Sequence, residues 1–203
     1  MTATTQPVQP TDQSETVSPM LGDKPGDQSP QQHLKAPLFT RTNMALRVFG
    51  GLARISLGWI FLWAFLDKTF GLGHDTTSKN AWIHGGSPTF GFLKFGAAGP
   101  FKGFYNSIAG AGWADWLFMI GLLTIGVALI LGVFMNLASA AGALLLLMMW
   151  TVVLPPDSNP IIDDHIIYAL TLGVLACLGA GRFLGLGSRW EQTPIVQRAS
   201  VLR

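Results

Sequence analysis

Residues 116–134 run WLFMIGLLTIGVALILGVF, a stretch without a single charged side chain. A helix needs about 20 apolar residues to cross the hydrocarbon core of a bilayer, and this stretch has that length. Three further segments are similarly apolar and similarly long, namely 47–66, 137–154 and 166–183. The sequence therefore predicts four membrane-spanning helices.

The composition points to the same class of protein. The 203 residues are 49% hydrophobic and only 12% charged, whereas charged residues supply about a quarter of a soluble globular chain. Small residues recur four positions apart inside the spans, as at Ala128 and Gly132, and this spacing lets helices approach closely in lipid. We expect an all-α fold, a polytopic four-helix membrane bundle.

Three regions follow from composition and charge. Residues 1–40 are rich in Thr, Gln, Ser and Pro without an apolar run, which predicts a disordered tail. The membrane domain takes residues 41–187, and a short basic tail takes 188–203. Because basic residues gather before the first span and after the fourth, the positive-inside rule predicts that both termini are cytoplasmic.

A long connection of residues 71–115 separates the first two spans and is rich in aromatic residues and glycine. It would face outward, although it carries Lys79, Lys94 and Lys102. Such a segment suits a position on the membrane surface or in the mouth of the bundle. Two interpretations stay open, a lid over a site and an interfacial loop that only anchors the bundle.

Two charged clusters end the first span and begin the last one, Asp67-Lys68 and Asp163-Asp164-His165. Both are expected at the same membrane face, where ionisable side chains are costly unless they pair or bind something. A helix cap explains one of the two aspartates. The clusters together are the best candidate for a working site, with proton exchange at the histidine and anion binding at the lysine.

Arg54 lies about two turns inside the first span. Its long side chain favours snorkelling to the lipid phosphates. The functional interpretation makes it a buried partner for a carboxylate or an anion.

Bound redox groups are not expected. Cys177 is the single cysteine, and all four histidines lie outside the spans or at an edge, so the sequence predicts no metal, haem or flavin site. Electrons would need a diffusible carrier, and a quinone, which takes up two protons on reduction, suits the charged clusters.

Three stretches together resemble the DoxX/DoxD family of bacterial and archaeal membrane proteins: ISLGWIFLWAFLDKTFG at 55–71, AWIHGGSP at 81–88 and NPIIDDHIIYA at 159–169. The resemblance implies a multi-pass protein of the prokaryotic plasma membrane. DoxD-type members form the large subunit of thiosulfate:quinone oxidoreductase, which oxidises thiosulfate to tetrathionate, passes the electrons to quinone and works with a DoxA subunit.

The resemblance and the charge pattern lead to one set of candidate residues. The predicted catalytic residues are Asp67, Lys68, Asp164 and His165, and the predicted substrate- or quinone-binding residues are Arg54, Trp82, His84 and Tyr168. If the chain is catalytic, a thiosulfate dehydrogenase that uses quinone is implied.

Two other classes of function are also considered. The first is a noncatalytic membrane anchor for redox enzymes, which other DoxX members are implied to be. The second is a small transporter, for which deep charged residues are expected and only Arg54 qualifies. The expected partners are the lipid bilayer and a DoxA-like subunit or another redox enzyme, with no nucleic acid. A homo-oligomer is one option that the sequence leaves open.

Overall fold

The computed structural model describes residues 2, 31–157 and 159–199, and this part of the chain contains helices and no strands. The chain divides into two units, Met1–Leu38 and Phe39–Arg203, and the following description concerns the second. Most of the predicted tail, residues 3–30, lies outside the described residues. The first helix, α1, nevertheless begins at Gln31, inside the segment predicted to be unstructured.

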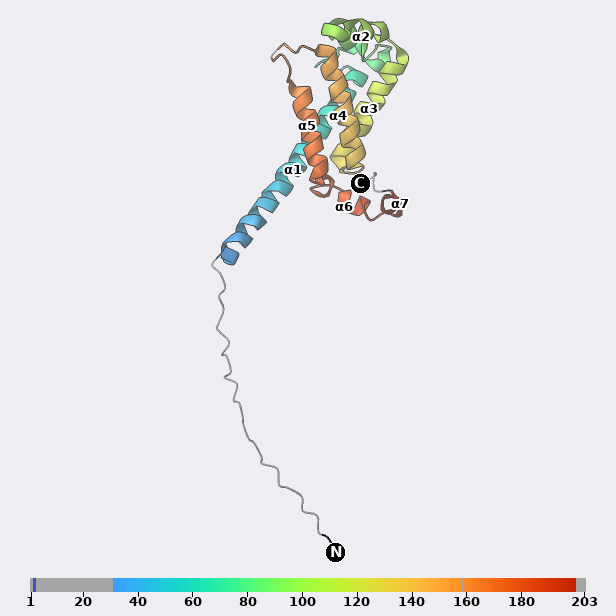
Figure 1. The fold of residues 1–203 in the computed structure, drawn as a ribbon. Coiled ribbons are helices and arrows are strands. Elements are labelled where there is room, and N and C mark those ends of the chain that lie inside the picture. Colours follow the sequence, from blue (N-terminus) through green and yellow to red (C-terminus); the bar gives the residue numbers. More distant parts are fainter. Residues whose placement is uncertain (1, 3–30, 158, 200–203) are drawn as a thin grey trace. The chain divides into compact units, whose positions relative to one another are not determined.

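Three helices are long and apolar enough to cross a membrane. They are α1 (Gln31–Phe70), of which Asn43–Phe70 qualifies, α3 (Gly112–Leu131) and α4 (Met135–Val153). In Figure 1, α3 and α4 lie side by side. The second and third predicted spans match α3 and α4 to within a few residues at each end.

The fourth long helix, α5 (Asp164–Cys177), has 14 residues and ends before the predicted limit at residue 183. A rise of 1.5 Å per residue gives it a length of about 21 Å, less than the ~30 Å of a hydrocarbon core. Gly179 explains the early end, because its φ of 59° is a left-handed conformation that stops a helix and suits glycine.

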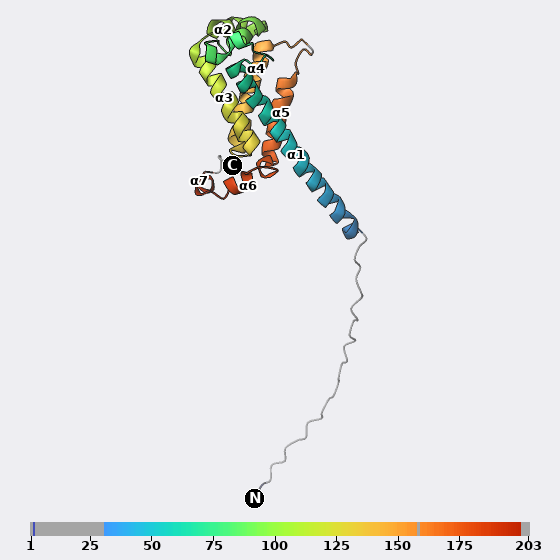
Figure 2. The ribbon, with the colours of Figure 1, turned by 180° about the vertical axis from the view of Figure 1, so that it is seen from behind.

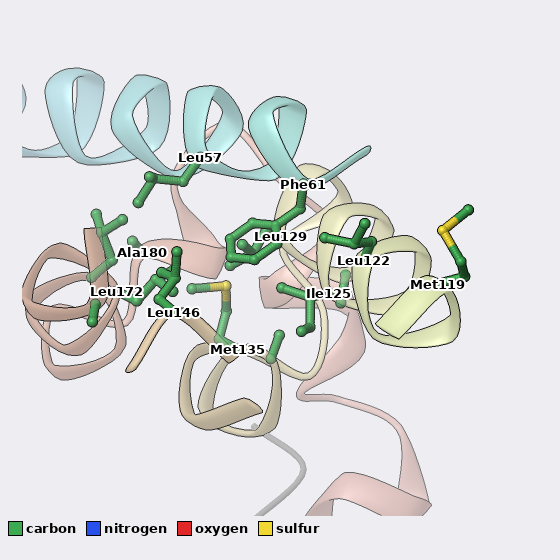
Figure 3. Close-up of a cluster of buried hydrophobic side chains, with 14 residues drawn as sticks. Leu57, Phe61, Met119, Leu122, Ile125, Leu129, Met135, Leu146, Leu172 and Ala180 are labelled. Atoms are coloured by element: carbon green, nitrogen blue, oxygen red, sulfur yellow. The ribbon is translucent and has the colours of Figure 1, made fainter. Parts of the chain in front are cut away.

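One hydrophobic core joins side chains from all four of these helices. Leu57 and Phe61 of α1 belong to this core, and Figure 3 shows the ring of Phe61 pointing from α1 toward Leu129 of α3. Leu172 of α5 completes the same cluster. The crossing of α1 and α3 depends on glycine, since a Cβ at Gly126 would lie 2.7 Å from the backbone nitrogen of Leu62.

Large apolar side chains also cover the outside of these helices. Trp59 is 51% exposed on α1, Leu117 is 66% exposed on α3, and Leu144 is 61% exposed on α4. A soluble monomer rarely exposes so much apolar surface. Their exposure therefore agrees with helices that meet lipid.

The connection between α1 and α3 is folded rather than extended. It forms η1 (Ser78–Asn80), η2 (Trp82–His84), the π-helical turn η3 (Phe92–Gly96), η4 (Gly99–Phe101) and α2 (Lys102–Ile108). Leu93 and Tyr105 pack with Val152 of α4 in a second small core. Figure 2 shows this connection gathered at the end of α3 and α4 where α2 lies.

The residues after α5 fold back onto the turn between α3 and α4. They form η5 (Ala180–Arg182), α6 (Gly187–Trp190) and α7 (Pro194–Arg198). The backbone N–H of Leu186 donates to the carbonyl of Leu131 at 2.8 Å, and Val196 is fully buried. Much of the predicted basic tail is thus ordered structure, while residues 200–203 lie outside the described part.

Candidate functional site

A large cavity opens beside the last turn of α1. Its volume is about 1130 Å³, and it lies between the end of α1, the folded connection, α3 and α4. Sites for small molecules and cofactors usually measure 300–1,000 Å³ and are lined mainly by apolar and aromatic side chains with a few polar groups. This cavity is slightly larger than that range, and it has the kind of lining that such a site needs.

The lining of the cavity changes character along its length. Lys68, Asn80 and Ser87 contribute polar groups where the end of α1 and the connection meet it. The walls from α3 and α4 are apolar, with Leu117 and Met148 among them. The cavity therefore suits an amphipathic molecule with a polar head and an apolar tail.

Lys68 is the only basic side chain in this lining, and it is partly buried. It has no hydrogen-bond or ion-pair partner within residues 31–157 and 159–199. An ammonium group carries three donors and no acceptor. Lys68 can therefore offer hydrogen bonds and a positive charge to a molecule in the cavity.

Asp67, the neighbour of Lys68, contacts the backbone of the turn that follows α1. Its carboxylate is 2% exposed and accepts hydrogen bonds from three backbone N–H groups, those of His74 at 3.3 Å, Asp75 at 3.1 Å and Thr76 at 2.8 Å. These bonds hold the turn that follows α1. Asp75 and Thr76 also line the cavity. Asp67 therefore helps to position residues at the polar end of the cavity, although it does not line the cavity itself.

Asp115 on the first turn of α3 was not singled out from the sequence. It is 6% exposed, and its Oδ1 accepts from the Ser87 hydroxyl at 2.9 Å, the Thr89 hydroxyl at 2.6 Å and the Thr89 N–H at 3.0 Å. Ser87 and Thr89 line the cavity. The signal in the sequence was an acidic residue directly before an apolar span, which resembles an ordinary helix start.

The second predicted cluster lies at the beginning of α5. Asp163 caps this helix by accepting from the N–H of Ile166 at 3.3 Å, and its Oδ2 lies 2.7 Å from Nδ1 of His165. Asp164 is farther from the same ring nitrogen, at 3.5 Å, and its side chain is 68% exposed. The carboxylate nearest to His165 is therefore that of Asp163, and the side chain of Asp164 lies farther from the ring.

The ligand atoms of Asp163, Asp164 and His165 lie within 4.8 Å of one another. This spacing would allow a metal ion. Three consecutive residues at the start of a helix are often this close to one another. Asp163 already caps α5, and its carboxylate also contacts His165. The geometry alone does not define a metal centre.

The two predicted clusters do not form one contact network. The end of α1 and the beginning of α5 lie at the same end of the core as α2 (Figures 1 and 2). No hydrogen bond or ion pair in the described part of the chain joins Lys68 to Asp163, Asp164 or His165, and these three do not line the cavity. Lys68 is the predicted catalytic residue that the cavity contains.

The environment of Arg54 in the structure differs from both interpretations drawn from the sequence. Arg54 is fully buried, so it does not snorkel, and its partners are carbonyl groups rather than a carboxylate. It donates to the carbonyls of Leu129 and Ile130, the latter at 2.9 Å, and to those of Phe183 at 3.0 Å and Leu184 at 3.1 Å. The last carbonyls of a helix lack partners within it, and Arg54 satisfies two of them at the end of α3.

The other predicted binding residues are dispersed. Trp82 stacks edge-on against Trp116, with ring centroids 4.6 Å apart. Nδ1 of the exposed His84 lies 2.7 Å from the carbonyl oxygen of Ser78, and Tyr168 packs against the main core. None of Arg54, Trp82, His84 and Tyr168 lines the cavity around Lys68.

A smaller cavity of about 250 Å³ lies among the end of α5, the start of α4 and α6. Its two charged residues are Arg182 and Glu191, which form an ion pair of 2.7 Å. Because this charge is already compensated, the larger cavity is the better candidate site.

No protein-family model, curated protein or solved structure matches this chain. The likeness to the DoxX/DoxD family stays a prediction from the three quoted motifs.

Proposed function

We propose that this chain is an integral protein of a prokaryotic plasma membrane, folded as a four-helix bundle of the DoxX/DoxD kind. Support comes from three helices of spanning length and from the single core that α5 shares with them. In this arrangement α5 and the residues flanking it form the fourth span. Both termini are cytoplasmic, and the folded connection lies at the outer face.

The cavity would hold a quinone, and the chain would serve as the membrane subunit of a quinone-linked oxidoreductase. The observation that carries this proposal is the position of Lys68 at the polar end of a cavity whose remaining walls are largely apolar. A quinone has carbonyl oxygens that accept hydrogen bonds and an apolar isoprenoid tail. Lys68 would donate to one carbonyl while the tail lies along α3 and α4.

The reaction in this proposal is thiosulfate oxidation. Two thiosulfate ions each lose one electron and join through a new sulfur–sulfur bond as tetrathionate, while the quinone gains two electrons and two protons and becomes a quinol. His165 with Asp163 would exchange protons at the same end of the core. A DoxA-like subunit or another redox enzyme would carry the electrons, because this role has no candidate in the chain's own sequence.

Quinone binding to the purified protein in lipid nanodiscs tests the proposal. Lys68→Met removes the charge and retains much of the side-chain volume, so it should weaken binding by about tenfold, the loss of one hydrogen bond to a charged group. Lys79→Met is the control, since Lys79 lies in the nearby folded connection but outside the cavity lining. Equal affinities in the two variants would contradict a role for Lys68.

The same preparation tests the redox step. Thiosulfate-dependent quinone reduction is measured with and without the proteins that copurify from native membranes. Absence of quinone binding, together with redox enzymes that copurify until residues 1–40 are deleted, would instead support the noncatalytic anchor.

A further inference from the structure

We infer that the site selects membrane-resident quinones by their isoprenoid tails. The tail lies in the groove between α3 and α4 and passes over Gly121. The inference rests on the proposed function and specifies its ligand class, a quinone with a long isoprenoid chain rather than a short soluble one. It also specifies the route of access, which is lateral from the lipid.

The groove has two facing walls. Trp113, Leu117, Gly121 and Ile125 follow one another at intervals of four along α3, and all of them line the cavity. Residues four apart share one side of a helix, and the distance from the first to the last is about 18 Å at 1.5 Å per residue. Residues of α4 from Ala141 to Val152 form the opposite wall. This length accommodates an extended apolar chain.

The groove is closed toward the core and open toward the outside. Ile125, at its deep end, is 4% exposed and belongs to the main hydrophobic core. Leu117 and Leu144, on the two walls, are 66% and 61% exposed. In a membrane these exposed leucines meet lipid, so a tail can slide between α3 and α4 without passing through water.

Gly121 provides room in the middle of the α3 wall. A Cβ at this position would find a single neighbour, Cδ2 of Leu145, at the ordinary contact distance of 3.9 Å. No backbone atom approaches it, in contrast to Gly126 five residues further on, where the helices cross. A larger side chain at Gly121 would therefore fill the groove and leave the helix crossing unchanged.

The test compares two quinones on three proteins. Gly121→Phe is set against the natural chain and against Gly173→Phe, a control on α5 where a Cβ meets nothing within 4 Å and which lies outside the cavity lining. Dissociation constants are measured in nanodiscs for a quinone with one isoprene unit and for the same head group with a long tail. Gly121→Leu is included in case the phenylalanine variant fails to fold.

We expect Gly121→Phe to weaken binding of the long-tailed quinone by about tenfold or more, as when a few methylene groups leave an apolar site. The short quinone should bind all three proteins with closely similar affinity. Equal weakening of both quinones, or no weakening of either, would overturn the inference while leaving the proposed function intact.

Two other outcomes distinguish the alternatives. If the natural chain binds the short and the long quinone equally well, the groove does not hold the tail and the inference is wrong. If it binds neither, the proposed function fails and the inference fails with it. Displacement of the long-tailed quinone by excess phospholipid would show that bilayer lipid fills the groove, which also contradicts the inference.

Discussion

Thr89 is held to Asp115 by two hydrogen bonds, one from its N–H at 3.0 Å and one from its hydroxyl at 2.6 Å. Both residues are buried. The contact fixes the connection between α1 and α3 to the first turn of α3, and it does so at the cavity, which Thr89 lines. The position of Thr89 in the cavity wall thus depends on the carboxylate of Asp115, which does not itself line the cavity.

Replacing Asp115 should weaken the attachment of the connection to α3 and lower the stability of the protein. Asp115→Ala leaves the buried N–H of Thr89 without its acceptor, and we expect a loss of about 1–3 kcal/mol in the free energy of unfolding. Thr89→Val removes the hydroxyl but retains the N–H bond, so it should cost less. Thermal unfolding in nanodiscs measures both, and equal stability of Asp115→Ala and the natural chain would contradict this role.

Arg54 is predicted to determine stability and not ligand affinity. Arg54→Met leaves the carbonyls of Ile130, Phe183 and Leu184 without their donor, and we expect a loss of about 3 kcal/mol or more. Arg54→Lys should be intermediate, because an ammonium group lacks the planar fork of a guanidinium. Melting temperature and the quinone dissociation constant of the folded fraction are measured together. An unchanged melting temperature with lost quinone binding would instead favour the original binding role.

Asp67 should act on the turn after α1. Asp67→Ala removes the acceptor of three backbone N–H groups, so hydrogen exchange of residues 71–77 should become faster while the cores of α3 and α4 remain protected. The comparison is made by mass spectrometry on matched peptides. Unchanged exchange in this turn would show that the carboxylate is dispensable there.

His165 should affect turnover rather than binding. His165→Ala removes the partner of Asp163 but leaves the helix cap from Asp163 to Ile166 in place, so quinone affinity and stability should change little. If His165 exchanges protons with the quinone, the rate of quinone reduction should fall by about 100-fold. Full turnover in this variant would remove His165 from the mechanism.

The long helices were predictable because their signal is compositional. The segments 116–134 and 137–154 contain no charge, and α3 and α4 occupy them nearly as expected. The limit of the fourth helix was not predictable from hydrophobicity, since the apolar sequence continues past Cys177. What ends the helix is the left-handed backbone at Gly179, a local conformation that apolar composition does not encode.

The site was predictable only in part. Lys68, which lines the cavity, was singled out because an ionisable residue at the end of an apolar span is conspicuous. The roles of Asp67, Asp115 and Arg54 could not be assigned, because each depends on backbone groups that the fold brings near. Nearly every residue carries a backbone carbonyl and an N–H group, so no pattern in the sequence marks the few that meet a charged side chain.

We propose that the cavity beside Lys68 holds a quinone. The most direct measurement is photolabelling of the protein in nanodiscs with a photoreactive quinone, followed by mass spectrometry of the labelled peptides. We expect labels within residues 113–121 and 141–149, and these labels should be suppressed by excess unlabelled quinone and reduced in Lys68→Met but not in Lys79→Met. Labels confined to α5 or the residues after it, or labels that excess quinone does not suppress, would contradict the proposal.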